Sequence, residues 1–340
     1  MTALEACPEY TLSGSDVAAL SALAEELWAA GDNPADPEFY DRCWPVIERI
    51  PLGVRRFLEE FRRGEPAAAC LIHGFPVDDD AAGPTPSHWE AAFEATSTRQ
   101  QEIFLALCGM ILGEPFTWST LQSGRLIQNI LPIAGDEMRQ NGHGSQMLLE
   151  FHTEDGFHPD RCDYLLLLGI RNHQRVPTLV ASVRDIALSG EHRAVLGQER
   201  FHILPDDEHV RQLETRDPQH PALAKMRGMR DGPEPVAVLF GDESDPYLRI
   251  DRPFMRCAPG DVEAERALDA LDAALQRAEQ DVVVGPGTLL VVDNHLAVHG
   301  RKPFEVRYDG TDRWLKKLTV SRNLRRSHAI SATKNRRVLF

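Results

Sequence analysis

The segment EFHTEDGFHP, residues 150–159, contains two side chains that bind metal ions well, His152 and Glu154, one residue apart. On a strand, residues i and i+2 point to the same face, so this pair can hold one ion. On a helix the same spacing directs the two side chains roughly 200° apart. His152 ends a strand-like run, SQMLLEFHTE. We therefore expect half of a metal site here, and a polar strand end is the alternative.

A second pair with the same spacing, His88 and Glu90, provides a contrast. The stretch TPSHWEAAFEATSTRQQEIFLALCGMILGEP predicts a helix that begins at Pro86 and Ser87 and ends near 113–115. A pair at the start of a helix cannot chelate one ion. We predict no metal site at this position.

The third ligand must come from elsewhere, and GPGTLLVVDNHLAVHGRKPF supplies candidates. It contains a β-prone run, a turn at Asp293–Asn294, and two histidines, His295 and His299. Either histidine would complete a site of two imidazoles and one carboxylate. Such a site leaves three positions open, which suits a non-haem Fe(II) centre that must bind a co-substrate and O₂. Zinc is the chemical competitor, although the lack of cysteine among the candidates favours iron.

An iron centre of this kind needs electrons to split O₂, and 2-oxoglutarate commonly supplies them. The distal carboxylate of 2-oxoglutarate requires a buried cation, and the planar fork of arginine matches a carboxylate best. Arg313 lies at the start of a predicted strand, fourteen residues after His299. It is the candidate for this contact.

Three segments resemble one family: FHTEDGFHPDRCDYLLLLGIRN, DNHLAVHGR and YDGTDRWLKKLTVSRNLRRS. They are similar to the clavaminate synthase-like Fe(II)/2-oxoglutarate-dependent dioxygenases, and most similar to the hydroxylases of free arginine, asparagine and lysine in antibiotic biosynthesis. The resemblance runs from about residue 70 to about residue 327. It implies an α+β fold, with a double-stranded β-helix (jelly-roll) core and helices packed outside.

The resemblance also implies roles for individual residues. The iron ligands would be His152, Glu154 and His299, which makes His295 a neighbour of the site. Arg313 would pair with the C5 carboxylate of 2-oxoglutarate, and the hydroxyl of Thr178 would assist it; a plain strand threonine is the alternative for Thr178.

The expected amino-acid pocket departs from the family pattern. Relatives that take arginine hold its guanidinium with two acids in a segment that matches YLRIDRPFM; Asp251 fills the first position and Pro253 stands at the second. A lost charge-assisted partner costs roughly 1.5–3 kcal/mol. The acids of GDESDP, residues 241–246, could compensate, and a solvated acidic turn is the alternative.

Three further positions differ. Lys317 stands where an arginine usually holds the substrate α-carboxylate, Leu121 with Gln122 adjacent stands where a glutamine is expected near the α-amino group, and Gly142 replaces a serine. Asp251 still favours a cationic side chain. We therefore rank arginine first, other basic amino acids next, and neutral or carrier-tethered amino acids last.

The sequence thus predicts an enzyme that uses Fe(II), 2-oxoglutarate and O₂ to hydroxylate a C–H bond of a small-molecule amino acid, usually at C3 in this branch. Desaturation or cyclisation by the same cofactors is an alternative outcome. A non-catalytic binding protein on the same barrel would lack a ligand or Arg313. A zinc hydrolase would give no reason for Arg313.

The elements that must position these residues fall into two parts. Residues 1–115 read as mainly helical, and SGSDVAALSALAEELWAAG predicts a helix with Ser15 as N-cap and Gly31 as its end. Residues 116–340 contain short β-type runs, which favour a sandwich or jelly-roll barrel core. We expect the two parts to form a single domain, residues 1–340. The runs are GRLIQNILPI, DYLLLLGI, PTLVAS, PVAVLFG, PYLRID, DVVVGPGTLLVVDN and RWLKKLTVSRN.

Two segments interrupt these runs. EAERALDALDAALQRAEQ predicts a helix, with one apolar face formed by Ala264, Ala267, Leu268, Leu271, Ala274 and Leu275. Residues 206–234 are polar and contain prolines. We expect a long loop there that acts as a mobile lid.

Composition limits the partners and the compartment. The net charge is −15, from 52 acidic and 37 basic residues, which argues against a nucleic-acid or anionic-membrane surface. The six cysteines show no CxxC pair, so we expect reduced thiols. The segment MTALEACPEY does not resemble a signal peptide. We expect a cytoplasmic protein, as a monomer or weak dimer.

Overall fold

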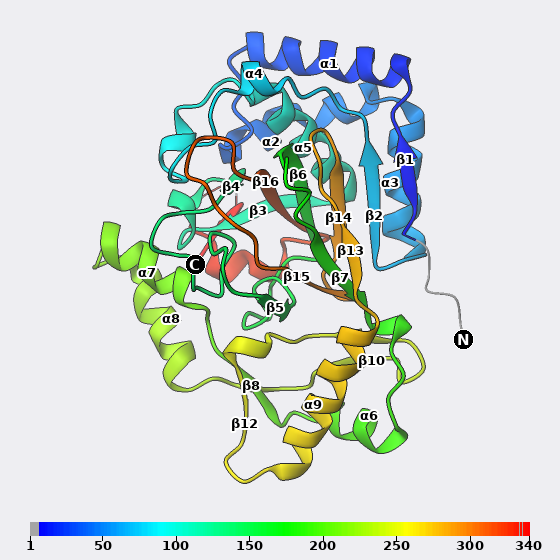
Figure 1. Ribbon diagram of the computed structural model, residues 1–340, viewed down its shortest axis with the longest axis vertical. Coiled ribbons are helices and arrows are strands. Elements are labelled where there is room, and N and C mark those ends of the chain that lie inside the picture. Colours follow the sequence, from blue (N-terminus) through cyan, green and yellow to red (C-terminus); the bar gives the residue numbers. More distant parts are fainter. Residues whose placement is uncertain (1–6, 333, 335) are drawn as a thin grey trace.

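The computed structural model describes residues 7–332, 334 and 336–340 (Figure 1). Its largest sheet is mostly antiparallel, with parallel pairs at its two edges. In pairing order its strands are β1 (Glu9–Thr11), β2 (Ala69–His73), β14 (Leu289–Asp293), β6 (Tyr164–Arg171), β16 (Trp314–Ser321), β3 (Glu114–Trp118) and β17 (Val338–Leu339), and β4 (Gln128–Ile130) also pairs with β16.

A second, antiparallel sheet of four strands carries much of the candidate site. Its order is β13 (Gln280–Val282), β7 (Thr178–Ser182), β15 (Ala297–Arg301) and β5 (Leu149–His152). The short remaining strands form two small sheets, one of β10 (Leu239–Gly241) and β11 (Pro246–Leu248), the other of β12 (Met255–Cys257), β8 (Phe201–Ile203) and β9 (Pro235–Val236). Every strand-like run predicted from the sequence overlaps at least one of these strands.

The large sheet is buried on both faces, which explains its continuous apolar runs. In β6, Tyr164, Leu166 and Leu168 pack in the cluster formed with the N-terminal helices. Leu165 and Leu167 point the other way, into a cluster that includes residues of β7 and β15. Because side chains alternate along a strand, a sheet covered on both faces needs apolar residues at every position.

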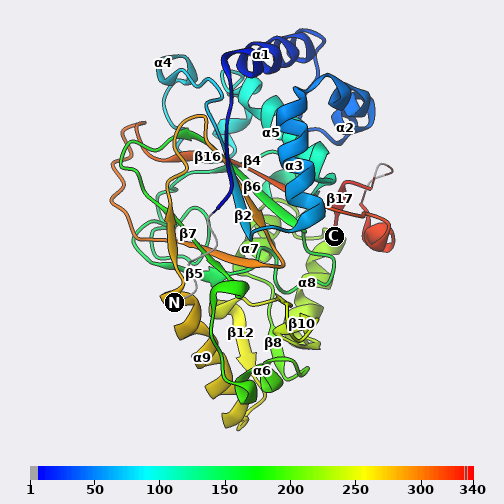
Figure 2. The ribbon, with the colours of Figure 1, turned by 90° about the vertical axis from the view of Figure 1, so that its right-hand side faces the viewer.

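The N-terminal helices cover one face of the large sheet (Figure 2). Among them α5 packs directly on β6 and β16, and α1 and α3 pack on α5. They are α1 (Gly14–Ala29), α2 (Pro37–Cys43), α3 (Leu52–Gly64), α4 (Asp79–Ala82) and α5 (Arg99–Leu112). Short 3₁₀ helices span Trp44–Arg49, Ala91–Phe93, Gln122–Gly124, Val183–Asp185, Arg252–Phe254 and Arg326–Ile330.

Two predictions about these helices were wrong in detail. The N-cap of α1 is Ser13, not Ser15, because Ser13 and Asp16 form a reciprocal capping box. The second predicted helix begins only at Arg99. The hydroxyl of Ser97, just before it, donates to the Ala82 carbonyl at 2.9 Å instead of capping the helix. The N-cap residue is Thr98, whose side chain forms no capping hydrogen bond.

The predicted loop at 206–234 is largely helical. It forms α7 (Asp207–Arg216) and α8 (Pro221–Asp231), which pack together (Figure 1). Asp206 caps α7 by accepting from the backbone N–H groups of Glu208 and His209, and Pro221 occupies the first turn of α8. The expectation of a loop was wrong, and the mobility of the lid stays a prediction.

The helix predicted from EAERALDALDAALQRAEQ is confirmed as α9 (Val262–Arg277), which packs against α6 (Gly190–Leu196) at the end of the molecule opposite α1 (Figure 1). Its buried face is the predicted one, formed by Ala264, Ala267, Leu268, Leu271, Ala274 and Leu275.

All six cysteines are free. No helix within the described residues has the length and apolar character needed to cross a membrane. Part of the segment considered for a signal peptide, residues 1–6, lies outside the described residues.

Candidate active site

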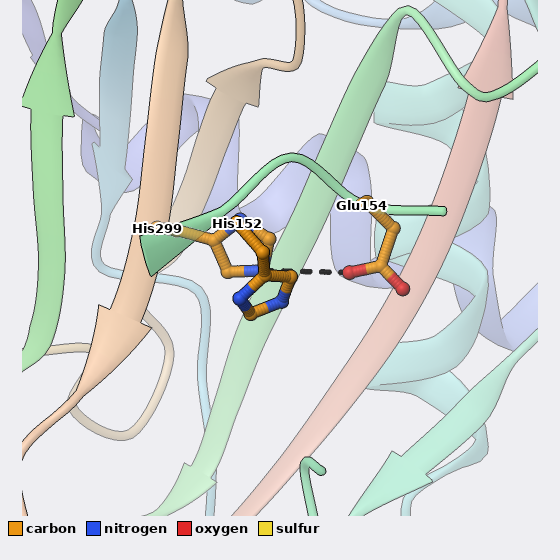
Figure 3. A group of neighbouring side chains, drawn as sticks. All are labelled: His152, Glu154 and His299. Carbon is orange, nitrogen blue, oxygen red and sulfur yellow. Dashed lines mark ion pairs between the residues drawn. The ribbon is translucent and has the colours of Figure 1, made fainter. Parts of the chain in front are cut away.

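The three predicted metal ligands come together where β5 ends beside β15 (Figure 3). The antiparallel register sets His299 directly opposite His152, with ring centroids 4.2 Å apart. Glu154 lies two residues beyond the end of β5, and its Oε2 is 3.4 Å from Nε2 of His299. One ligand atom from each residue lies within 4.8 Å of the others. Within the described part of the chain, this is the one group of His, Cys, Asp or Glu side chains that meets this criterion.

The protonation of the group suits a metal ion. Burial, followed by the charge of His299, lowers the pKa of His152 to about 4. His152 Nδ1 lies 2.9 Å from the Glu150 carbonyl, which fixes the ring and leaves Nε2 for a metal. Burial alone would raise the pKa of Glu154, but the Lys317 ammonium and then His299 hold it well below its usual value. Two imidazoles and a carboxylate fit Fe(II) with open positions.

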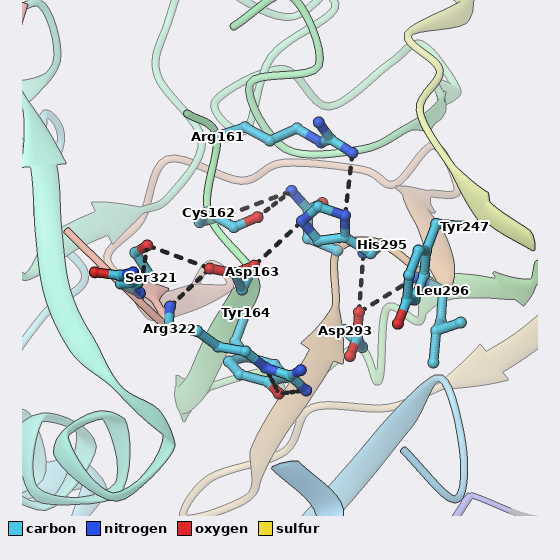
Figure 4. A network of polar contacts seen from close by, with 12 residues as sticks. Arg161, Cys162, Asp163, Tyr164, Tyr247, Asp293, His295, Leu296, Ser321 and Arg322 are labelled. Atoms are coloured by element: carbon cyan, nitrogen blue, oxygen red, sulfur yellow. Dashed lines mark hydrogen bonds and ion pairs between the residues drawn. The ribbon is translucent and has the colours of Figure 1, made fainter. Parts of the chain in front are cut away.

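His295, the alternative third ligand, belongs to a different network (Figure 4). Its Nε2 is 3.3 Å from Asp163 Oδ1, and its Nδ1 is 3.4 Å from the Arg161 guanidinium. The pair His88 and Glu90 was expected to be separated by a helix. The two lie in a turn instead, with Nδ1 of the half-buried His88 3.6 Å from Oε2 of the exposed Glu90. They have no third ligand among the described residues.

A buried cationic end of the same pocket contains Arg313 and Thr178. Arg313 NH2 donates to Thr178 Oγ1 at 3.2 Å, while its buried Nε has no hydrogen-bond partner among the described residues. Burial, followed by the charge of Arg301, lowers the pKa of Arg313 to about 9. No carboxylate of the described residues pairs with either arginine. An anion at this end would stabilise both guanidinium groups.

Arg301 was not singled out from the sequence. It lies two residues after His299 on β15 and opposite Thr178 on β7, so it shares the strand face of the metal ligand. It is buried, and its hydrogen bonds to carbonyl oxygens are long, such as that to Met147 at 3.3 Å. Its guanidinium also lies over the Phe304 ring, 5.1 Å from the ring centroid. The HGR sequence that follows the valine of β15 was the available signal.

An acidic region of the pocket contains the buried Asp251 and the half-buried Asp206. The Asp251 backbone forms a β-bridge with His152, which places this acid beside the metal group. Burial and the charge of Asp206 raise the pKa of Asp251 well above its usual value. Neither acid has an ion-pair partner among the residues the structure describes. A bound cation would remove this repulsion.

The GDESDP acids do not supply the compensating carboxylate that the sequence left open. Asp245 pairs with Arg184 at 2.8 Å, and Asp242 accepts from Ser244 Oγ at 2.5 Å. Both acids are exposed and lie outside the pocket. Asp206, which precedes α7, lies in the pocket instead.

Lys317 lines the pocket, but its ammonium forms an ion pair with Oε1 of Glu154. Glu154 therefore directs one oxygen to Lys317 and the other to His299. The neighbouring Lys316 points to the helical side, where it donates to Glu102 and Asn129 at 2.7 Å. The contact of Lys317 with a substrate carboxylate stays a prediction.

The other predicted pocket residues form its wall. The Gln122 side chain accepts from Asn129 N–H and donates to the Asn129 carbonyl, both at 2.9 Å, so its amide is already engaged. Leu121 presents an apolar surface. A Cβ at Gly142 would come 3.1 Å from Ile130 Cδ1, so a serine there would require Ile130 to move.

The helix α7 covers the pocket through polar contacts that the sequence did not reveal. Glu208 accepts from Asn141 Nδ2 at 2.8 Å, and Gln212 Oε1 accepts from the Gln122 N–H at 2.7 Å. His209 Nε2 lies 2.9 Å from Asp155, the residue that follows Glu154. The apolar spacing of Val210 and Leu213 behind an acidic N-cap was the signal for this helix.

Comparisons with known proteins match this site to iron oxygenases. Residues 91–319 match the family model described as "Taurine catabolism dioxygenase TauD, TfdA family". The chain is 39% identical over 340 residues to the enduracididine beta-hydroxylase of Streptomyces hygroscopicus, covering 97% of this chain and 98% of that protein. It is 36% identical over 342 residues to the L-ornithine/L-arginine 3-hydroxylase of Catenulispora acidiphila, with coverage of 97% and 98%.

Solved structures of a non-heme iron oxygenase are also similar to this chain. The non-heme iron oxygenase OrfP in complex with Fe, succinate and (3S)-hydroxy-L-Arg is similar with a TM-score of 0.92 and 39% identity, covering 98% of this chain and 100% of that one. Its complex with Fe and alpha-ketoglutaric acid has a TM-score of 0.86 at 38% identity, with the same coverage.

The metal ligands can be tested by alanine substitution. His152→Ala and His299→Ala should each remove an imidazole from the ion, so metal binding should fall at least about tenfold and turnover should be abolished. His295→Ala is the matched control, and it should keep both. Metal content after dialysis against Fe(II) or Co(II) checks this. Loss of the metal in His295→Ala with retention in His299→Ala would reassign the third ligand.

Proposed function

We propose that this chain, which belongs to the TauD, TfdA family of dioxygenases, hydroxylates C3 of free L-arginine or a closely related cationic amino acid. It is an enzyme that uses Fe(II), 2-oxoglutarate and O₂. The observation that carries the proposal is one pocket that combines a two-histidine, one-carboxylate group with guanidinium groups and acids that have no ion-pair partner among the described residues. A role in natural-product biosynthesis follows the names of its relatives.

We also assign the two main sheets to the double-stranded β-helix of this family. The pocket is lined from both sheets, with Leu167 and Leu315 from the large one and Thr178 and His299 from the small one. Helices cover the outer face of the large sheet. The similarity to the OrfP structures supports this assignment.

The cationic end would hold the co-substrate. When bound, Fe(II) with 2-oxoglutarate and O₂ supplies oxidation of a C–H bond to C–OH, with 2-oxoglutarate converted to succinate and CO₂. Arg313 and Thr178 would bind the C5 carboxylate, and the buried charge of Arg301 would add to the attraction. His299 and Arg301 are two residues apart on one strand face, roughly 6.8 Å. That spacing suits a five-carbon diacid whose two ends bind different groups.

The acidic region would hold the substrate cation. Asp251 is buried and borders His152, and Asp206 is half-buried. A guanidinium placed between two carboxylates gains charge-assisted hydrogen bonds and relieves their repulsion. Asp206 thus provides a second acid although Pro253 stands at the family position.

The position of α7 also explains how water would be excluded. Asp206 is the N-cap of α7, so the helix that covers the pocket brings one of the acids with it. Binding of the substrate cation would favour the covered state, in which the reacting carbon is held near the metal and away from solvent.

The reaction class can be tested directly with a panel of free amino acids, Fe(II), 2-oxoglutarate and ascorbate. Mass spectrometry should show succinate and a +16 product for L-arginine, with smaller amounts for other basic amino acids. A −2 product would indicate desaturation or cyclisation instead of hydroxylation. Absence of succinate above background with every amino acid would contradict the proposal.

The co-substrate contact can be tested with Arg313→Met. Loss of a charge-assisted hydrogen bond should raise the KM for 2-oxoglutarate roughly tenfold to a hundredfold. Arg161→Met is a matched control, because Arg161 is equally buried with a pKa lowered to about 9 but lies outside the pocket. The KM of Arg161→Met for 2-oxoglutarate should stay within about twofold of the wild-type value. Equal effects of the two substitutions would show that Arg313 acts through stability alone.

The substrate cation site can be tested with Asp251→Asn and Asp206→Asn. Each should lower kcat/KM for L-arginine by roughly ten- to a hundredfold, while citrulline, a neutral isostere, should be affected much less. Asp242→Asn, in the exposed GDESDP segment, should change neither substrate. An unaltered arginine-to-citrulline ratio in both pocket variants would place the cation elsewhere.

A further inference from the structure

The metal ligand Glu154 has unusual backbone support. It lies beyond the end of β5, so no strand ladder pairs its N–H and C=O groups. The Asn294 side chain does so instead: its Oδ1 accepts from Glu154 N–H at 2.7 Å, and its Nδ2 donates to the Glu154 carbonyl at 3.0 Å. One carboxamide therefore takes the place of a neighbouring strand, and we call these two hydrogen bonds the Asn294 clamp.

Asn294 is itself firmly held. It is fully buried in the turn between β14 and β15, and β15 carries His299. Its Nδ2 also donates to the Cys162 carbonyl at 3.0 Å, and its backbone N–H donates to the Asp163 carbonyl at 2.8 Å. Two carbonyl acceptors and one N–H donor fix which end of the amide faces which partner.

We propose that Asn294 is a positioning residue for the metal centre, which couples the Glu154 segment to the strand that carries His299. The proposal rests on the proposed function for the identity of the metal. Asn294 does not touch the metal group; it acts through the Glu154 backbone, which sets where the carboxylate points.

The surroundings of Glu154 show why this support matters. Its carboxylate lies between Lys317 on one side and His299 on the other. The next residue, Asp155, adopts a left-handed backbone with φ of 52°, which is uncommon for a residue with a Cβ. Without the Asn294 clamp the carboxylate could turn wholly to Lys317, and the ion would lose a ligand.

Only a carboxamide supplies both the acceptor and the donors at this position. Asn294→Asp keeps the size but places a carboxylate oxygen against the carbonyls of Glu154 and Cys162. Asn294→Ala removes the clamp and leaves the Glu154 backbone groups unpaired. The two variants perturb the same bonds in chemically different ways, so a shared effect on the metal is attributable to the clamp.

Asn172 provides a matched control. Its side chain accepts from Val176 N–H and donates to the Val176 carbonyl, both at 2.9 Å, and donates to the Val284 carbonyl at 3.1 Å. It is buried like Asn294 and lies outside the pocket. Asn172→Asp and Asn172→Ala should therefore cost similar stability without touching a metal ligand.

The experiment is a titration of the metal-free full chain with Co(II), which has visible absorption bands sensitive to its ligands. Thermal unfolding of the wild type and of all four variants is measured alongside. Asn294→Asp and Asn294→Ala should bind Co(II) about ten- to a hundredfold more weakly, with altered bands. The Asn172 variants should unfold at similarly lowered temperatures and still bind Co(II) within about twofold of the wild type.

The outcomes distinguish a failure of the proposed function from a failure of the positioning role of Asn294. If the wild type takes up no Co(II), the proposed function fails. If the wild type binds and both folded Asn294 variants bind as tightly with unchanged bands, the role of Asn294 is overturned while the function stands. If Asn294→Asp does not fold, Asn294→Ala carries the same comparison. Equal weakening by the Asn172 variants would reduce Asn294 to a general contribution to stability.

Discussion

The pairing register between β15 and β5 is the constraint on which the site depends. It sets His299 opposite His152, and because side chains alternate along a strand, both imidazoles face the same interior. A slip of one residue would turn one of them to the other face. Glu154, beyond the end of β5, is held to the same strand pair through Asn294. The strand pairing thus brings the three metal ligands together, although they are up to 147 residues apart in the sequence.

Charged side chains of opposite sign line different regions of the pocket, so the pocket favours one orientation of its charged ligands. Arg313 and Arg301 have no acid within ion-pair distance among the described residues, and the pKa of each is lowered. Asp251 and Asp206 have no ion-pair partner among the described residues, and burial raises the pKa of each, although the charge of His209 partly offsets this at Asp206. Leaving such groups unpaired is costly. The arrangement is therefore explained by ligands with the complementary charges, an anionic co-substrate and a cationic substrate.

The sequence predicted the residues whose role depends on local geometry. The spacing of His152 and Glu154 at a strand end and the apolar face of α9 needed only the period of a strand or helix. The choice between His295 and His299 could not be made from spacing and came from the family resemblance. The partnership of Asp206 with Asp251 was missed, because 206–234 read as a polar loop and no local pattern links residues 45 positions apart. Ser15 was preferred to Ser13 as a cap because two serines near a helix start look alike without the capping box.

The most direct test of the account is a crystal structure of the chain with Fe(II), 2-oxoglutarate and L-arginine, grown without oxygen. The account predicts iron at roughly 2.0–2.2 Å from nitrogen atoms of His152 and His299 and an oxygen of Glu154. The distal carboxylate of 2-oxoglutarate should lie on Arg313, and the guanidinium of the substrate should lie between Asp251 and Asp206. Iron bound at His295, or a pocket that holds the two organic ligands the other way round, would contradict it.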